Sequence, residues 1–314
     1  MTDVASTGRL PRLPPTPLLP EEEEPGVLPR PARPGALAEL RATASDLWRV
    51  RGLLYELSLR DLRVRYKQAL FGLAWALLTP ALVLFAGLIV RVAVARSAGR
   101  GGDAAETAAI AVKALPWSFF ASAVAGAAGS LSSNASLLTK VYFPREVLPI
   151  AAVAAHLVDL AAGALAATVL LAALGVGASP ALLWVPPLVL LLVLLTVAAS
   201  LVLSCANVFF RDVKYVVQVL LTFGIFFTPV LFEPAMLGPR LARLVMLNPM
   251  SPIFEGLRLA VVNGHDLLAP LVSPAGVVAW RPTYLAYAAA WSVGGLLLAL
   301  LLFARLERLF ADYV

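Results

Sequence analysis

Two ionisable side chains, His156 and Asp159, interrupt an otherwise apolar segment, and they are the first residues in this sequence that could do chemistry. They lie three residues apart, so a helix over residues 147–174 would place them on one face. A carboxylate in the middle of a bilayer costs about 3 kcal/mol, and Asp159 should therefore face protein or water. The spacing allows a hydrogen-bonded pair or a proton relay. We favour the pair, because a relay needs further carboxylates inside the apolar segments.

The residue types that would make this chain an enzyme are scarce. Its histidines are His156 and His265, and the sequence contains neither His-Glu-x-x-His nor Asp-x-Asp. A membrane enzyme acting on lipid-linked sugar would need such clustered acids or metal ligands. We therefore predict no catalytic and no metal-ligating residues. Nor does any lysine lie in a Gly-x-x-x-x-Gly-Lys-Ser/Thr loop, so the chain should bind neither nucleotide nor another cofactor: the lysines are Lys67, Lys113, Lys140 and Lys214.

Long charge-free segments dominate the chain. Residues 160–210 contain no Asp, Glu, Lys or Arg, and the whole chain is 60% hydrophobic and only 14% charged. A spanning helix needs about 20 apolar residues, and a helix satisfies its own backbone hydrogen bonds in lipid. The sequence therefore predicts an all-α membrane protein with six transmembrane helices, near residues 72–94, 113–137, 147–174, 183–208, 214–232 and 282–304.

Basic residues indicate the orientation of these spans. Short cytoplasmic loops are rich in Lys and Arg, and most of the 25 basic residues lie on that side if both termini are cytoplasmic. The net charge of +6 follows from this arrangement and requires no nucleic-acid partner. Residues 1–36 are rich in proline and carry an acidic run at 21–24, which is typical of a disordered tail. We predict a multi-pass protein of the cytoplasmic (inner) membrane with a cytoplasmic N-terminal tail.

Residues 37–71 combine an apolar stripe with basic flanks. The apolar residues recur at helical spacing from Leu47 to Leu57. This pattern is typical of an amphipathic helix lying in the membrane interface, and a positively charged stop before the first span is the alternative. The basic and aromatic residues near its end, which would also brace a cytoplasmic partner, are Arg60, Arg63, Arg65, Tyr66 and Lys67.

Residues 138–149 join the second and third predicted spans on the cytoplasmic side. The segment is short, charged and aromatic, and Pro144 and Pro149 stiffen it. A stiff, charged connector suits docking into a groove on another protein, and a simple turn is the alternative. The residues that would make the contact are Lys140, Tyr142, Phe143, Pro144, Arg145 and Glu146.

Residues 233–264, between the fifth and sixth predicted spans, are divided by prolines into pieces too short to span and too apolar for an exposed loop. Short re-entrant helices fit better, because irregular backbone at membrane depth must be surrounded by protein or a water-filled cavity. Glu255 and Arg258 lie three apart and can pair on one helical face. We expect these pieces to form a gate at the outer mouth.

Four motifs in this chain together resemble the permease subunits of ABC-2 type exporters, most closely those that export O-antigen, teichoic acid and related polysaccharides. The likeness covers about residues 47–310, with the motifs in the right order and spacing. They are Arg60–Gln68 leading to Gly72–Trp75 and Pro80, Tyr142–Pro149, Asn207–Val213, and Asn248–Met250 with Glu255–Arg258.

The resemblance implies a six-helix ABC-2 transmembrane domain over residues 72–314, working as a homodimer in membrane lipid. Each copy would dock on a separate ABC ATPase subunit, and ATP and Mg²⁺ would bind to the two copies of that ATPase. Residues 138–147 would be the coupling helix, and the pieces within 233–264 would be the gate helices. The substrate would be a lipid-linked polysaccharide.

Aromatic side chains are the candidates for the translocation path, because sugar rings present apolar C–H faces that stack on flat surfaces. For any single residue we favour the plainer reading that it faces lipid or packs the bundle. The candidates are Trp75, Phe85, Trp117, Phe119, Phe120, Phe223, Phe226 and Phe227.

Two other classes of transporter compete with this interpretation. A drug or lipid exporter of the same ABC-2 group is the main alternative, and the motifs Tyr142–Pro149 and Asn248–Arg258 favour the polysaccharide group over it. An ion-driven secondary transporter should show inverted repeats or paired broken helices with charged midplane sites, and we find neither pattern in the sequence.

Overall fold

Long apolar helices dominate the computed structural model, which describes residues 35–66, 78, 81–82, 85–86, 88–89, 104–140, 143–273 and 276–312. Among these described residues, four helical segments are long and apolar enough to cross a membrane. They are α4 (Ala104–Ala128), α7 (Val147–Ala173), α8 (Val185–Phe209) together with the preceding η1 (Pro180–Trp184), and α12 (Pro282–Leu306). They match the second, third, fourth and sixth predicted spans and confirm an all-α membrane protein.

The first and fifth predicted spans are not among these four segments. The first, 72–94, lies largely outside the described residues, as does the predicted tail over 1–36. At the fifth, α9 (Val213–Phe227) has 15 residues and a length of about 22 Å, shorter than the roughly 30 Å of hydrocarbon. It ends at Thr228, which is extended because Pro229 follows it.

The predicted bounds of the second span, 113–137, are wrong at both ends. Helix α4 begins at Ala104 and stops at Ala128, and two short helices follow it, α5 (Ser130–Ser133) and α6 (Ala135–Lys140). The helix is interrupted at Asn134, whose side-chain amide donates to the carbonyl oxygen of Ser130 at 2.8 Å. Such local side-chain bonds compete with helix propagation, and a charge-free pattern does not reveal them.

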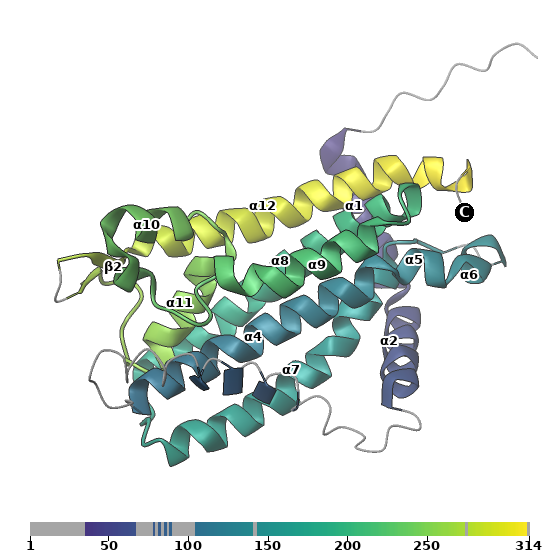
Figure 1. The fold of residues 1–314 in the computed structure, drawn as a ribbon. Helices are drawn as coiled ribbons and strands as arrows, with labels where there is room; N and C mark the ends of the chain where they lie inside the picture. The colour runs from purple at the N-terminus through teal and green to yellow at the C-terminus, as the bar shows by residue number, and fades with distance from the viewer. Residues whose placement is uncertain are drawn as a thin grey trace, which may run out of the picture. The chain divides into compact units, whose positions relative to one another are not determined.

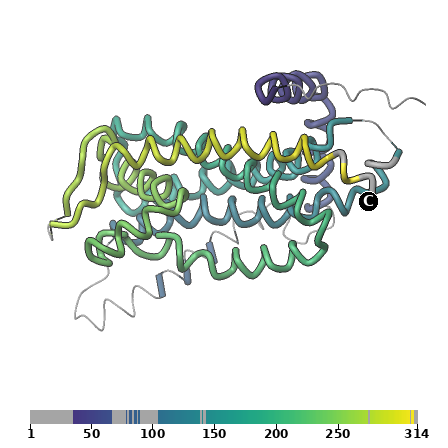
Figure 2. The backbone as a smooth tube through the Cα atoms, turned by 90° about the horizontal axis from the view of Figure 1, so that it is seen from above, coloured from purple at the N-terminus to yellow at the C-terminus, as the bar shows by residue number. Residues whose placement is uncertain are grey.

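Helix α8 is the central element of the bundle. It packs against α12, α4 and α7, and α4 also packs against α7. Figures 1 and 2 show α4, α8, α9 and α12 running along a common direction. Leu188, Leu192 and Leu201 of α8 are buried in this contact. A β-carbon at Gly163 of α7 would lie 2.3 Å from the terminal methyl of Leu115 on α4, so a larger residue there would force the Leu115 side chain to move, and the small residue lets the two helices approach closely.

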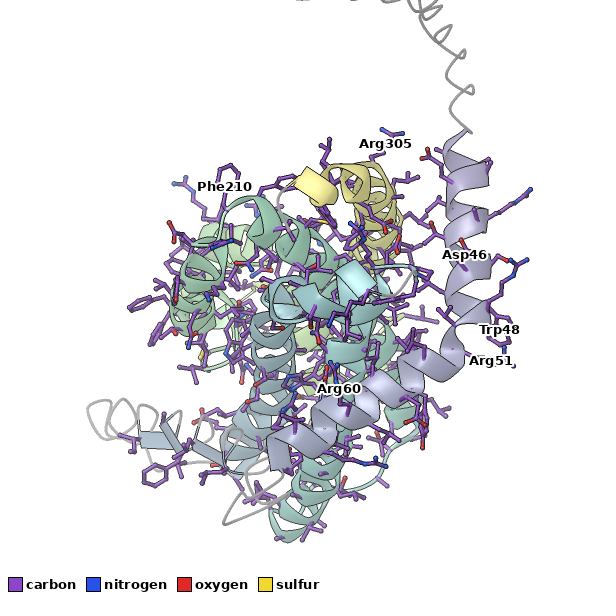
Figure 3. The ribbon with its side chains drawn as sticks, turned by 90° about the vertical axis from the view of Figure 1, so that its right-hand side faces the viewer. Asp46, Trp48, Arg51, Arg60, Phe210 and Arg305 are labelled. Atoms are coloured by element: carbon purple, nitrogen blue, oxygen red, sulfur yellow. The ribbon has the colours of Figure 1, made fainter. Side chains whose placement is uncertain are left out.

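The segment predicted as one interfacial helix over 37–71 forms two helices. These are α1 (Ala36–Arg49) and α2 (Arg51–Tyr66), which meet at an angle near Trp48 and Arg51 (Figure 3). Backbone bonds of helical spacing continue across Val50 at 3.0 Å, and Gly52 disfavours a straight helix interior at this point. Helix α1 packs against α12, whereas α2 packs against α7.

Short elements lie at the two ends of the long helices (Figure 1). We call residues 36–66, 129–146 and 307–312 the connector end; the last of these form η3 (Glu307–Asp312). We call residues 228–281 the hairpin end. It contains η2 (Pro234–Leu237), α10 (Gly238–Val245), α11 (Met250–Val261) and an antiparallel hairpin of β1 (Leu271–Val272) and β2 (Val278–Trp280). The hairpin was not predicted, because its strands are too short to show alternation.

Candidate functional site

At the connector end, the predicted docking residues divide into two groups. Arg145 and Glu146 face the chain itself: the Arg145 guanidinium lies 3.5 Å from a carboxylate oxygen of Glu307 and 5.9 Å from the ring of Phe310. Glu146 is only 4% exposed. Lys140 is exposed, Phe143 and Pro144 are half-buried, and Tyr142 lies outside the described residues. The surface open to a partner therefore begins at Lys140 and does not include the Glu146 carboxylate.

The burial of Glu146 has an electrostatic consequence. Removal from water disfavours its charged form, and the nearby carboxylates of Glu307 and Asp46 add to the effect. Together they raise the pKa of Glu146 to about 7. Burial also raises the pKa of Glu307, which the Arg145 guanidinium opposes. This end of the bundle therefore holds a carboxyl group that titrates near neutral pH.

A second polar cluster joins α2 to the middle of α7. Arg65 Nη1 lies 2.6 Å from Asp159 Oδ2, and the Tyr66 hydroxyl donates to Asp159 Oδ1 at 2.5 Å. His156 Nδ1 lies 3.2 Å from Asp159 Oδ2, as the predicted pairing requires. Burial and the bond to Asp159 raise the pKa of Tyr66 to about 12.

This cluster gives the buried polar residues of α7 their partners. The Arg65 guanidinium also donates to His156, with Nη2 to Nε2 at 2.8 Å. Gly126 of α4 approaches the same ring, and a β-carbon there would lie 3.2 Å from His156 Nε2. Arg60 Nη2, one turn earlier on α2, lies 2.9 Å from Asp61 and donates to Asn134 at 3.0 Å. Sequence reasoning found the His156–Asp159 pair, but it assigned Arg65 and Tyr66 to a cytoplasmic partner and missed their contacts with Asp159, although a lone carboxylate among apolar residues calls for a basic partner.

At the hairpin end, Glu255 and Arg258 form a buried ion pair. Glu255 is 0% and Arg258 7% exposed, and Arg258 Nη2 lies 2.5 Å from Glu255 Oε1. Arg258 Nη1 lies 3.6 Å from Glu233 and donates to Asn263 at 3.0 Å. These extra partners matter, because a buried ion pair is tolerated only when its remaining donors and acceptors are satisfied.

The surroundings of this pair fix the chain between α9 and α11. Lys113 of α4 is buried and its Nζ donates to the carbonyl oxygen of Phe232 at 2.7 Å. Asn248 donates to the Thr228 hydroxyl at 3.2 Å. Helix α11 contacts α4, α8, α12 and η1, and its residues from Met250 to Ala260 are buried. Segment 228–237 is thus held by two buried cations, Lys113 and Arg258, of which only Arg258 was predicted to form a contact at this end.

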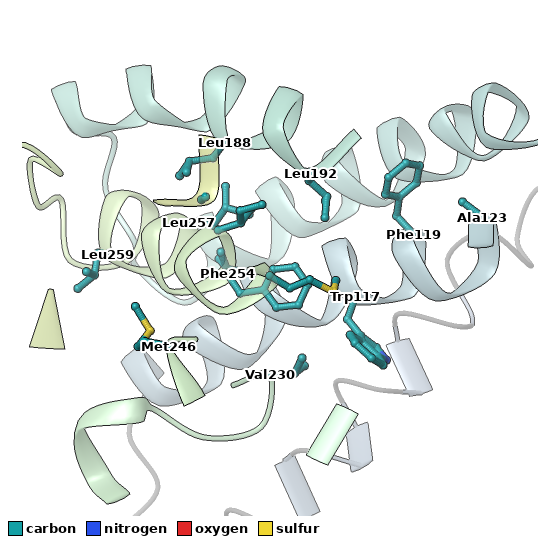
Figure 4. Close-up of a cluster of buried hydrophobic side chains, with 14 of the residues drawn as sticks. Trp117, Phe119, Ala123, Leu188, Leu192, Val230, Met246, Phe254, Leu257 and Leu259 are labelled. Carbon is teal, nitrogen blue, oxygen red and sulfur yellow. The ribbon is translucent and has the colours of Figure 1, made fainter. Parts of the chain in front are cut away.

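The aromatic candidates do not form one surface. Trp117 and Phe119 are buried, and Trp117 lies edge-on to Phe254 with ring centroids 6.5 Å apart (Figure 4). Phe120 is half-buried against Trp117. By contrast, exposed aromatic rings lie one helical turn apart on α9, and Phe85 is also exposed. Trp75 lies outside the described residues. The exposed α9 rings are Phe223, Phe226 and Phe227.

Comparisons with known proteins agree with the motifs found in the sequence. Residues 53–262 match the ABC-2 type transporter family. The chain is 32% identical over 236 residues to the O-antigen export system permease protein RfbA of Myxococcus xanthus, a match covering 74% of this chain and 89% of that protein. It is also 27% identical over 220 residues to the RfbA permease of Klebsiella pneumoniae, covering 68% of this chain and 81% of that protein. The chain belongs to the ABC-2 type transporter family.

Proposed function

We propose that this chain is the permease subunit of an ABC exporter that moves a lipid-linked polysaccharide of the O-antigen type across the cytoplasmic membrane. The observation that carries the proposal is the 32% identity to an O-antigen export permease over 89% of that protein's length. The helices long enough to span a membrane agree with it, and so do the polysaccharide-type motifs.

The proposed assembly is a homodimer with two copies of a separate ATPase that binds ATP and Mg²⁺. Each permease has six spans, the first within residues 72–94, and both termini are cytoplasmic. The fifth span is α9, whose 15 residues are short for a bilayer and would require local thinning of the membrane. The connector end is then cytoplasmic and the hairpin end extracytoplasmic. Helices α1 and α2 lie at the cytoplasmic interface, where their basic residues meet lipid headgroups.

Coupling to the ATPase is proposed for the connector between α6 and α7. Lys140, Phe143 and Pro144 present the accessible surface, with Tyr142 between them in the sequence. Arg145 anchors this connector to the permease through Glu307 and Phe310, and the neighbouring Glu146 side chain is buried. Movement of the ATPase would therefore be transmitted directly to α7 and η3.

Gating is proposed for α10 and α11. The Glu255–Arg258 pair, with Glu233, fixes the orientation of α11 relative to the segment that follows α9. Among the aromatic candidates, we assign the path to Phe223, Phe226 and Phe227, because these rings are exposed along one face of α9. Trp117 and Phe119 instead pack the core that supports them.

A deletion strain tests the proposed function. Removal of this permease should abolish polysaccharide at the cell surface and cause lipid-linked glycan to accumulate on the cytoplasmic side. Expression of the wild-type chain should restore export, whereas the chain co-expressed with a hydrolysis-deficient ATPase should not. Normal surface polysaccharide in the deletion strain, with loss of another exported compound, would assign the chain to a drug or lipid exporter instead.

A further inference from the structure

A cavity at the hairpin end is independent of the buried ion pair and of the α9 aromatic face. It has a volume of about 370 Å³ and lies between α10 and the first turns of α12. Two arginines, two tyrosines and a threonine provide its polar lining, and a methionine and a leucine provide apolar groups: Arg243, Met246, Leu247, Arg281, Thr283, Tyr284 and Tyr287. We call these seven residues the arginine cavity.

The charge of the arginine cavity is positive. Arg243 is held by its Nε, which donates to the carbonyl oxygen of Pro239 at 3.0 Å, so its terminal nitrogens stay available. Within the described part of the chain, no carboxylate lies within ion-pair distance of Arg243 or Arg281, whereas Glu233 and Glu255 lie within that distance of Arg258. Two guanidinium groups on one cavity favour an anion with several oxygens, and their planar forks match phosphate.

The tyrosines give the same cavity a rigid aromatic wall. The Tyr287 hydroxyl donates to the carbonyl oxygen of Leu247 at 2.5 Å and so connects α12 to the end of α10. Tyr284 lies edge-on to Trp280 at 5.9 Å, and Tyr287 lies edge-on to Trp291 at 6.3 Å. Rings fixed in this way present flat surfaces on which a sugar ring can stack through its C–H face.

Exposed leucines extend from the arginine cavity along α10. Leu241 and Leu244 are 53% and 62% exposed and lie beside the basic residues of this short helix. Leu247, which lines the cavity, is 62% exposed. Apolar and basic side chains adjoining on one helix are typical of a surface that meets lipid at the headgroup level. A ligand with an anionic group and a hydrocarbon chain fits this surface better than a soluble anion.

We propose that the arginine cavity binds the phosphate that joins the glycan to its lipid carrier. The two guanidinium groups hold the phosphate oxygens, the tyrosines contact the first sugar, and the lipid chain lies along the leucines of α10. This assignment rests on the proposed function and deepens it. It places a substrate-binding site at the extracytoplasmic mouth, where the exported lipid-linked glycan leaves the permease.

Binding of farnesyl diphosphate, a short isoprenyl diphosphate, tests the site directly. The permease with its ATPase is placed in nanodiscs of phosphatidylcholine, and dissociation constants are measured by isothermal titration. Arg243→Gln and Arg281→Gln should each weaken binding about tenfold, since each removes charge-assisted hydrogen bonds. Arg240→Gln is the matched control on the same helix outside the cavity, and its affinity should equal that of the wild type. Farnesol, which lacks the phosphates, should not bind.

Three outcomes would overturn the assignment. Equal affinities of the wild type, Arg243→Gln and Arg281→Gln would show that the cavity does not bind phosphate. Equal binding of inorganic pyrophosphate would indicate a site for soluble anions. Loss of farnesyl diphosphate binding when phosphatidylglycerol replaces phosphatidylcholine in the nanodiscs would indicate a general headgroup site. Surface polysaccharide in the complemented deletion strain is scored separately, so failure of this site and failure of the exporter assignment are distinguishable.

Discussion

Arg65 at the end of α2 and Asp159 in the middle of α7 form a 2.6 Å ion pair across a separation of 94 residues. Each charge explains the other, because an unpaired carboxylate or guanidinium would be costly on a membrane helix. Through this pair and the bond from Tyr66, α2 is fixed against the third span. The basic helix is therefore part of the helix bundle, and movements of α7 should displace it.

Substitution of the pair tests this link. Asp159→Asn should lower stability by about 2 kcal/mol, because it leaves Arg65 without its charged partner. For a chain of this size the melting temperature should fall by roughly 3 °C. The double variant Arg65→Gln/Asp159→Asn should regain part of this loss in a double-mutant cycle. Strictly additive losses would mean that the two side chains do not interact.

Glu146 should make stability depend on pH. Because its pKa is raised to about 7 from an ordinary value near 4.5, the folded state binds more protons than the unfolded state between these values. The contribution of protonated Glu146 to the free energy of unfolding should therefore be fully present below about pH 4.5. It should be lost as the pH rises through 7, by up to about 3 kcal/mol.

This prediction is tested by measuring the melting temperatures of the wild type and of Glu146→Gln as a function of pH. The variant should be more stable than the wild type at pH 8 and similar to it at pH 5, because glutamine stays neutral. Glu56→Gln, on the exposed face of α2, is the control and should change neither value. A wild-type melting temperature that rises from pH 5 to pH 8 would contradict the burial of Glu146.

The features of the fold and of the candidate site that could be predicted from the sequence are those that many neighbouring residues determine together. The long spans α8 and α12 follow from charge-free runs, α7 follows from an apolar run interrupted only by His156 and Asp159, and the Glu255–Arg258 pair follows from helical spacing. The partner of Asp159 could not be found in this way, because no local pattern relates residue 65 to residue 159. The break at Asn134 and the hairpin with Gly276 at φ 72° depend on single side chains and tight turns, which hydrophobic patterns do not record.

The Glu255–Arg258 ion pair predicts an order of effects among the carboxylates around Arg258. Glu255→Gln removes the 2.5 Å partner of a buried guanidinium and should cost about 3–5 kcal/mol in stability. Glu233→Gln removes a partner at 3.6 Å and should cost clearly less. Thermal unfolding of the two purified variants measures the difference. A larger loss for Glu233→Gln would assign the main support of Arg258 to the segment after α9.

Labelling of single cysteines tests the orientation of the two ends. In a Cys205→Ala background, Leu244→Cys on the exposed face of α10 should react with a membrane-impermeant thiol reagent in intact cells. Lys140→Cys at the connector end is the matched exposed position and should react only after the membrane is opened. The reverse pattern would invert the proposed topology, with the connector outside and the hairpin end inside.

Transport in a reconstituted system tests the central claim most directly. The permease and its ATPase, placed together in proteoliposomes, should move a lipid-linked polysaccharide across the membrane when ATP and Mg²⁺ are supplied, as scored by protection of the glycan from an external glycosidase. The permease alone should show only background ATP hydrolysis and no transport. Robust ATP hydrolysis by the isolated permease, or ATP-independent movement of the glycan, would contradict the assignment of this chain as the permease of an ATP-driven polysaccharide exporter.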